Sequence, residues 1–124
     1  MNRILWAVVA AMVLTWGMAG IGYTEPEPVK VGSVTPLTGK LAVYGEGFQK
    51  AMYLALEEVN AEGGINGRPM EIVFEDNTST SKGSVSAIQK LITVNKLPVI
   101  FGPAASSNFL AVCPIAQQNE TVLI

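Results

Sequence analysis

The sequence predicts an α/β protein built on a doubly wound parallel sheet. Short apolar runs alternate along the chain with segments of helical periodicity, in the order strand–helix–strand–helix–strand–helix–strand. The connections between these segments are short, and two parallel strands joined through a helix form a right-handed crossover. We therefore expect a parallel sheet covered by helices on both faces.

The composition limits the classes of function. The 124 residues carry 8 Lys and Arg against 10 Asp and Glu, a net charge of −2 with no basic run, so we expect no nucleic-acid partner. The chain has no histidine, and Cys113 is its only cysteine. This excludes a Ser–His–Asp triad or a Cys–His pair within the chain and argues against zinc. We expect no metal, no cofactor and no enzyme activity.

An apolar N-terminal segment indicates export. Arg3 is the only charged residue before Glu25, and an apolar run over residues 4–18 ends in small residues. This pattern is typical of a secretory signal peptide, which we assign to residues 1–22. An uncleaved membrane anchor is the alternative, because the uncharged stretch approaches the roughly 20 residues that span a bilayer. Either way, we expect a periplasmic or extracellular protein.

A polar, proline-bearing linker over residues 23–28 leads into the predicted domain. The first strand follows over residues 29–34, where apolar residues alternate with others. Residues 35–45 then form a predicted loop that is longer than the few residues usual before a helix. Tyr44 lies in this loop, and excess length at such a place often serves function. The alternative is a tyrosine that packs on its own loop.

Two helices and a second strand come next. Residues 46–61 carry an apolar stripe at helical spacing, made of Phe48, Ala51, Met52, Ala55, Leu56 and Val59. Residues 70–76 are a predicted strand whose acidic residues favour an edge position. Residues 77–81 form a polar loop that can cap a second helix ending near Asn95.

The stretch over residues 97–109 is where we expect the functional site. An apolar run stops at Gly102-Pro103, and Ser106 or Ser107 is a natural N-cap for a helix that extends to about Gln118. Free backbone N–H groups, two hydroxyls and the positive end of a helix dipole would then face one crevice. This arrangement suits a carboxylate or another small anion. The alternative is that the serines only cap the helix.

The end of the chain completes the expected sheet. Pro114 should kink or shorten the last helix, and residues 121–124 begin a fourth strand, where the chain stops as if truncated. We expect the second strand at one edge, followed by the first, third and fourth. The order then reverses between the first and third strands, and ligands of open sheets bind outside the carboxyl ends at such a point. The loop with Tyr44 and the turn before Ser106 meet there.

Residues 29–39, 44–47, 60–67 and 102–107 have a sequence, order and spacing that resemble the periplasmic binding proteins for branched-chain amino acids. These are leucine/isoleucine/valine-type solute receptors of ABC importers, with two α/β lobes that close on a ligand. The resemblance implies that residues 29–124 are an incomplete N-terminal lobe of the type I fold. The chain would be roughly the first third of such a receptor.

The resemblance also implies roles for particular residues. Ser106, with its neighbours Ala105 and Ser107, would grip the α-carboxylate of an amino acid through hydroxyl and backbone N–H groups. Tyr44 stands where the family places an aromatic residue beside the ligand. The next contacts would lie beyond Ile124, so we expect no measurable affinity from this chain alone. The implied partners are an amino acid or amide ligand and the permease subunits of an ABC transporter.

Other functions remain possible at this point. A membrane-anchored sensory ligand-binding domain is the main alternative, and a retained N-terminal anchor would favour it. An enzyme of the doubly wound class would need a nucleotide-binding loop, and two near-matches fail. Leu41 stands where one motif needs Ser or Thr, and Lys50 replaces the third glycine of the other. An exported α/β domain whose serines merely cap a helix is the simplest alternative.

Overall fold

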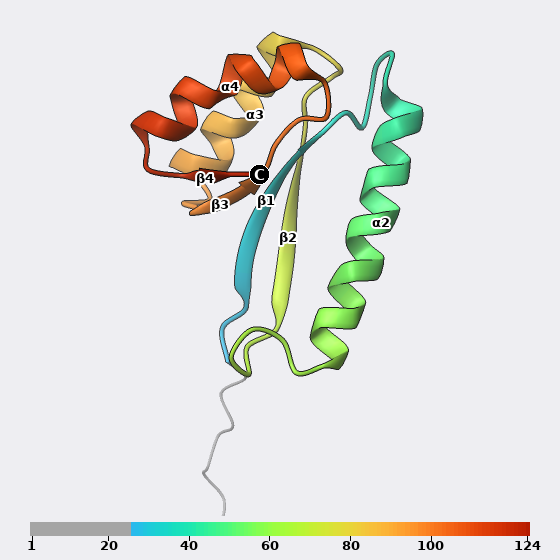
Figure 1. Ribbon diagram of the computed structural model, residues 1–124, viewed down its shortest axis with the longest axis vertical. Coiled ribbons are helices and arrows are strands. Elements are labelled where there is room, and N and C mark those ends of the chain that lie inside the picture. The colour runs from blue at the N-terminus through green and yellow to red at the C-terminus, as the bar shows by residue number, and fades with distance from the viewer. Residues whose placement is uncertain (1–25) are drawn as a thin grey trace, which may run out of the picture.

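The computed structural model describes residues 26–124 (Figure 1). Its elements are β1 (Val29–Thr35), α2 (Ala42–Ala61), β2 (Met70–Asp76), α3 (Ser81–Thr93), β3 (Val99–Phe101), α4 (Ser106–Gln118) and β4 (Val122–Leu123). The predicted signal peptide, its membrane-anchor alternative and the first half of the linker lie outside the described residues. Within 26–124, no helix has the length and apolar character needed to cross a membrane.

The strands form one parallel sheet in the order β2-β1-β3-β4, as expected. β1 pairs with β2 along its whole length and with β3 at Gly32 and Ser33. α2 covers one face of the sheet, and α3 and α4 cover the other (Figure 1). The predicted doubly wound α/β fold and the edge position of β2 are therefore confirmed.

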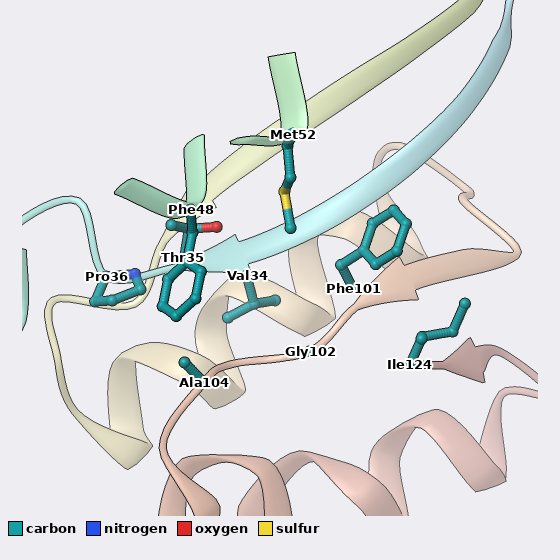
Figure 2. A pocket seen from close by; sticks show the side chains of 9 residues that line it. All are labelled: Val34, Thr35, Pro36, Phe48, Met52, Phe101, Gly102, Ala104 and Ile124. Atoms are coloured by element: carbon teal, nitrogen blue, oxygen red, sulfur yellow. The ribbon is translucent and has the colours of Figure 1, made fainter. Parts of the chain in front are cut away.

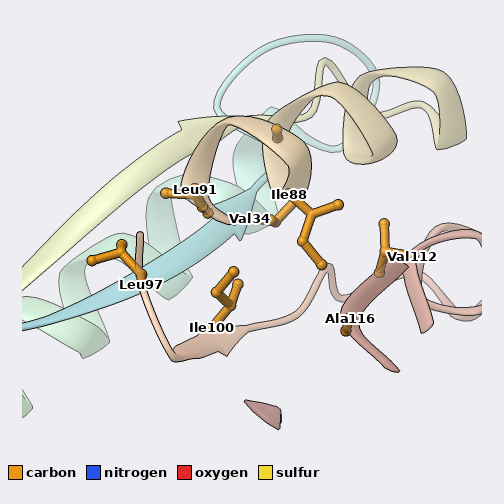
Figure 3. Close-up of a cluster of buried hydrophobic side chains, with 8 residues drawn as sticks. Val34, Ile88, Leu91, Leu97, Ile100, Val112 and Ala116 are labelled. Carbon is orange, nitrogen blue, oxygen red and sulfur yellow. The ribbon is translucent and has the colours of Figure 1, made fainter. Parts of the chain in front are cut away.

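The hydrophobic core lies between the sheet and the α3–α4 layer (Figure 3). Its buried side chains are Val34, Ala87, Ile88, Leu91, Leu97, Ile100, Val112 and Ala116. Gly32 faces this layer, where an added Cβ would lie 3.0 Å from Leu91 and 3.1 Å from Ile100. Each buried Leu or Ile contributes about 1.5–3 kcal/mol to folding. Packing thus anchors α3 and α4 firmly to the sheet.

The opposite face is covered more thinly. The structure describes every residue of α2, and Gly45 is the only one of them that is buried. The predicted apolar stripe does turn toward the sheet, but Phe48 remains 41% exposed. Tyr53 packs against Phe74 of β2, with 5.3 Å between the ring centroids. α2 is therefore held to the sheet by fewer buried contacts than α3 and α4.

α2 begins earlier than we predicted. The helix starts at Ala42 rather than Glu46, so the loop shortens to residues 36–41 and Tyr44 lies in the first helical turn. Glycine weakens helices, which made a loop the natural prediction for this segment. Here Gly45 serves close packing, because a Cβ at this position would collide with the carbonyl oxygen of Pro36.

Pro114 does not shorten α4, which runs to Gln118. A proline in a helix removes the hydrogen bond to the carbonyl of the residue four positions earlier. That residue is Leu110, which is 71% exposed, and Pro114 is itself exposed. Of the two effects expected at Pro114, a kink or a shortening, the shortening does not occur, because the lost bond lies on the exposed side of the helix.

A carboxylate ties the loop after β1 to the end of β2. Asp76 Oδ1 accepts hydrogen bonds from the N–H groups of Leu37 (3.0 Å), Thr38 (3.2 Å) and Thr78 (2.8 Å). Its Oδ2 accepts from the Thr38 hydroxyl at 2.5 Å. Burial raises the pKa of Asp76, but these hydrogen bonds outweigh it and hold the pKa below its ordinary value. The ionised carboxylate thereby fixes the loop that leads into α2.

Substituting the two glycines at the start of α2 tests the close packing. Gly45→Ala should lower the free energy of unfolding by about 1–3 kcal/mol, because its methyl group meets the Pro36 carbonyl. Gly47→Ala is the matched control, since a Cβ at Gly47 has no atom within 4 Å. The control should raise stability by about 0.5–1 kcal/mol. Urea unfolding followed by circular dichroism measures both, and equal effects would contradict the assignment.

The Asp76 carboxylate should make stability depend on acid pH. Its pKa is lower in the folded state, so its contribution is present above about pH 4 and is lost as the pH falls through the folded-state value. Asp76→Asn should lower the free energy of unfolding by about 1 kcal/mol at pH 7, because it weakens the hydrogen bonds that the charged carboxylate accepts. The loss is no larger because Asp76 is partly exposed to water. The difference from the unsubstituted protein should shrink as the pH is lowered below 4.

Urea unfolding between pH 7 and pH 3 provides the measurement. Glu71→Gln removes a carboxylate from the same strand, where Glu71 forms an exposed ion pair with Lys30 at 3.5 Å. This control should change stability by less than about 0.5 kcal/mol. The Asp76 variant and the unsubstituted protein could instead differ in free energy of unfolding by the same amount at every pH. That result would rule out the ionised carboxylate as the source of the difference.

Candidate functional site

The carboxyl edge of the sheet opens between β1 and β3. The chain leaves β1 toward α2 on one face and leaves β3 toward α4 on the other face. Figure 1 shows that α2 and α4 both begin at this end of the sheet. Parallel sheets form ligand crevices where successive connections diverge in this way. The strand order thus produces the crevice that the sequence predicted.

The turn after β3 delivers the start of α4 to this crevice. Its N-cap residue is Ala105, with extended backbone angles and no side-chain cap. Ser106 and Ser107 are the first two helical residues, so the prediction that one of them is the N-cap was wrong. The Ala105 carbonyl already accepts the N–H groups of Asn108 (3.0 Å) and Phe109 (2.9 Å). This backbone geometry places the N-cap one residue before the first serine.

Ser106 and Ser107 are both exposed, and Ala105 is half-buried. Neither serine N–H donates to another residue within 26–124. The first N–H groups of a helix lack intrahelical acceptors, and the helix dipole adds a partial positive charge there. Two backbone donors and two hydroxyls are therefore available to an anion at the start of α4.

Tyr44 lies in the first turn of α2, the helix on the other face of the sheet from α4. Its side chain is 65% exposed, so it does not pack on its own loop. No hydrogen bond joins it to the start of α4 within the described part of the chain. Nearby, the pKa of Glu46 is lowered by a hydrogen bond and by charge attraction from Lys50, 2.7 Å away. Tyr44 thus presents a free aromatic ring at the sheet edge.

A hollow of about 200 Å³ lies between α2 and the turn after β3. Its lining is largely apolar and consists of Val34, Thr35, Pro36, Phe48, Met52, Phe101, Gly102, Ala104 and Ile124. Figure 2 shows Phe48 and Met52 extending from α2 toward β1. The sequence predicts these two residues only as part of an apolar helical stripe. Their helical spacing signals an apolar face but not the hollow beneath it.

The predicted site residues do not line this hollow. Tyr44, Ala105, Ser106 and Ser107 lie outside it, and Ala104 is the lining residue next to them in the sequence. The buried Thr35 hydroxyl in the wall already bonds to Ser33 at 2.7 Å. Complete small-molecule sites usually enclose about 300–1,000 Å³. The hollow is therefore smaller than a complete ligand pocket and is not enclosed.

No group of three or more His, Cys, Asp or Glu side chains within 26–124 is arranged to hold a metal ion. Cys113 is a half-buried free thiol in α4. At the sheet edge the start of α4 offers helix N–H groups and hydroxyls, α2 offers the ring of Tyr44, and the Asp76 carboxylate is already bonded to the loop after β1.

Solved structures of substrate-binding proteins share this fold. LivJ from Streptococcus pneumoniae, a branched-chain amino acid transporter substrate-binding protein solved in complex with isoleucine, superposes with a TM-score of 0.75 and 35% identity. The match covers 78% of this chain and 28% of LivJ. The leucine-binding protein LivK from Thermotoga maritima gives a TM-score of 0.70 and 28% identity, over 77% of this chain and 26% of LivK.

Sequence relatives agree with the structural ones. The Leu/Ile/Val-binding protein BraC3 of Rhizobium johnstonii is 25% identical over 120 residues, covering 97% of this chain and 32% of BraC3. A Leu/Ile/Val-binding protein homolog from Brucella abortus is 29% identical over 89 residues, covering 72% of this chain and 22% of that relative. The chain thus spans a third or less of the length of these relatives.

The family model for periplasmic binding proteins matches residues 28–124, almost the whole of the described structure. The match agrees with the parallel sheet and its strand order. It also agrees with the resemblance to branched-chain amino acid receptors that four segments of the sequence carry. The chain belongs to the periplasmic binding protein family.

Proposed function

We propose that this chain supplies part of the N-terminal lobe of an exported, non-enzymatic solute receptor of an ABC importer. Its ligand is an amino acid or a similar small carboxylate or amide, bound between two lobes, and its protein partners are the permease subunits in the membrane. The observation that carries the proposal is the exposed start of α4, where Ser106 and Ser107 offer N–H and hydroxyl groups at the sheet edge.

The start of α4 suits the α-carboxylate of such a ligand. Hydrogen bonds to a charged group contribute about 1.5–3 kcal/mol each, and the helix dipole adds about 0.3–1 kcal/mol. Ser106 and Ser107 would donate to the carboxylate oxygens, with Ala105 alongside. The exposed ring of Tyr44 would pack against the ligand from the start of α2.

The second wall of the site must come from outside the described residues. The hollow beside Ala104 is smaller than a complete ligand pocket and open on one side. A receptor that closes by hinge motion buries its ligand only when both lobes are present. Residues 1–124 alone should therefore show no saturable binding of amino acids, consistent with the third or less of each relative that they span.

Sequencing the gene through and beyond the codon for Ile124, followed by calorimetric titration of the encoded protein, tests the proposal. The probes are leucine, isoleucine, valine and their amides, and we expect saturable binding of at least one. Ser106→Ala or Ser107→Ala should weaken binding by about 10- to 100-fold, because each removes a hydroxyl that donates to a charged ligand.

Ser86→Ala is the matched control, since Ser86 is exposed on α3 and bonds only to the Lys82 carbonyl in its own helix. It should leave the affinity unchanged. An encoded protein that binds none of these probes would contradict the receptor proposal. Equally tight binding by residues 1–124 alone would contradict the two-lobe site.

A further inference from the structure

The loop between β2 and α3, residues 77–80, lies between the starts of the other two helices. α3 has a side-chain N-cap of its own, since Thr80 Oγ1 accepts from the N–H of Gly83 at 2.9 Å. α2 and α4 do not, because their N-cap residues are Leu41 and Ala105 and neither makes a side-chain cap bond. The side chains of their own N-cap residues therefore do not fix the starts of α2 and α4.

Toward α2, the loop reaches the segment that leads into the helix. Ser79 Oγ accepts from the N–H of Leu41 at 3.0 Å and donates to the carbonyl of Thr38 at 2.7 Å. Asp76 holds the same segment at its beginning through Leu37 and Thr38. Because α2 buries little of its own surface, these polar bonds do much to orient its first turn.

Toward α4, a side-chain hydrogen bond from the start of α3 reaches the first turn of the helix. Ser81 Oγ, at the start of α3, donates to Asn108 Oδ1 at 2.9 Å. Asn108 is 4% exposed and directly follows Ser107 in the first turn of α4. Its own N–H donates to the Ala105 carbonyl. The pair therefore links α3 to the turn that carries the free N–H groups.

The loop is held in a constrained conformation. Thr78 and Ser79 both have left-handed backbone angles, with φ of 52° and 58°. β-branched residues such as Thr78 rarely adopt this region unless the surroundings impose it. Asp76 Oδ1 accepts from Thr78 N–H at 2.8 Å, and Asn77 Oδ1 accepts from Ser79 N–H at 2.9 Å. Asn77 is 1% exposed, so this support is built into the fold.

We propose that Asp76, Ser79 and Ser81 are positioning residues that hold the starts of α2 and α4 in one arrangement before a ligand arrives. Tyr44 and Ser107 lie within one turn of the segments that these residues hold. A preformed site avoids the cost of ordering its groups on binding. The purpose of this arrangement rests on the proposed function, whereas the arrangement itself belongs to the ligand-free protein.

Two-dimensional ¹H–¹⁵N NMR of the ligand-free, isotope-labelled full chain tests the connection to α4. Ser81→Ala should move the amide resonances of Ser106, Ser107 and Asn108. Ser81→Thr keeps a hydroxyl at this position and should return them to their original places. Ser86→Ala removes a hydroxyl from the same helix, bonded at 3.3 Å to the Lys82 carbonyl, and should leave the α4 resonances unmoved.

Ser79→Ala tests the connection to α2. Loss of its hydroxyl should speed the hydrogen exchange of the Leu41 amide by about threefold or more and shift the Tyr44 amide. The amides of Ile88 and Ile100, in the core, should keep their exchange rates in both variants. Faster exchange in the core would show general loss of stability and overturn a positioning role.

The proposal is also overturned if Ser81→Ala moves the α4 resonances no more than Ser86→Ala does, or if Ser81→Thr fails to restore them. Because no ligand is present, these results are independent of the receptor proposal. An encoded protein that binds no amino acid would defeat the proposed function while leaving these shifts in place. Absence of the shifts in a protein that does bind would defeat only the positioning role.

Discussion

The pairing of β1 with strands on both of its sides is the constraint on which the rest of the structure depends. β2 lies on one side and β3 on the other, so the connection from β1 to β2 runs over one face and the crossover from β2 to β3 over the opposite face. α2 and α4 consequently begin at the same sheet edge but on different faces (Figure 1). The crevice between them follows from hydrogen-bond topology before any side chain is considered.

The two faces of the sheet are stabilised in different ways. Leu91, Ile100 and their neighbours make a close-packed layer that holds α3 and α4 (Figure 3). On the other face, α2 buries little besides Gly45, and the polar bonds of Asp76 and Ser79 fasten the loop before it. Hydrogen bonds are more directional than apolar contacts, which suits the placement of a helix start.

The candidate site was predictable only in part. A serine pair after an apolar strand indicates a helix start, and residues 106 and 107 do lie there with free N–H groups. That the N-cap is Ala105 depends on backbone angles that Ala and Ser adopt equally well. The hollow lined by Phe48 and Phe101 brings together α2 and β3, and no local pattern relates these two elements.

The sequence by itself determined the element types, their order and the parallel sheet, because periodicity and turn residues report interactions between near neighbours. Only the tertiary structure decided the start of α2, since the role of Gly45 depends on the carbonyl of Pro36. It alone also revealed the bonds from Asp76 to Thr38 and from Ser81 to Asn108, which join residues 38 and 27 positions apart. Such pairs meet only once the sheet has brought its loops to one edge.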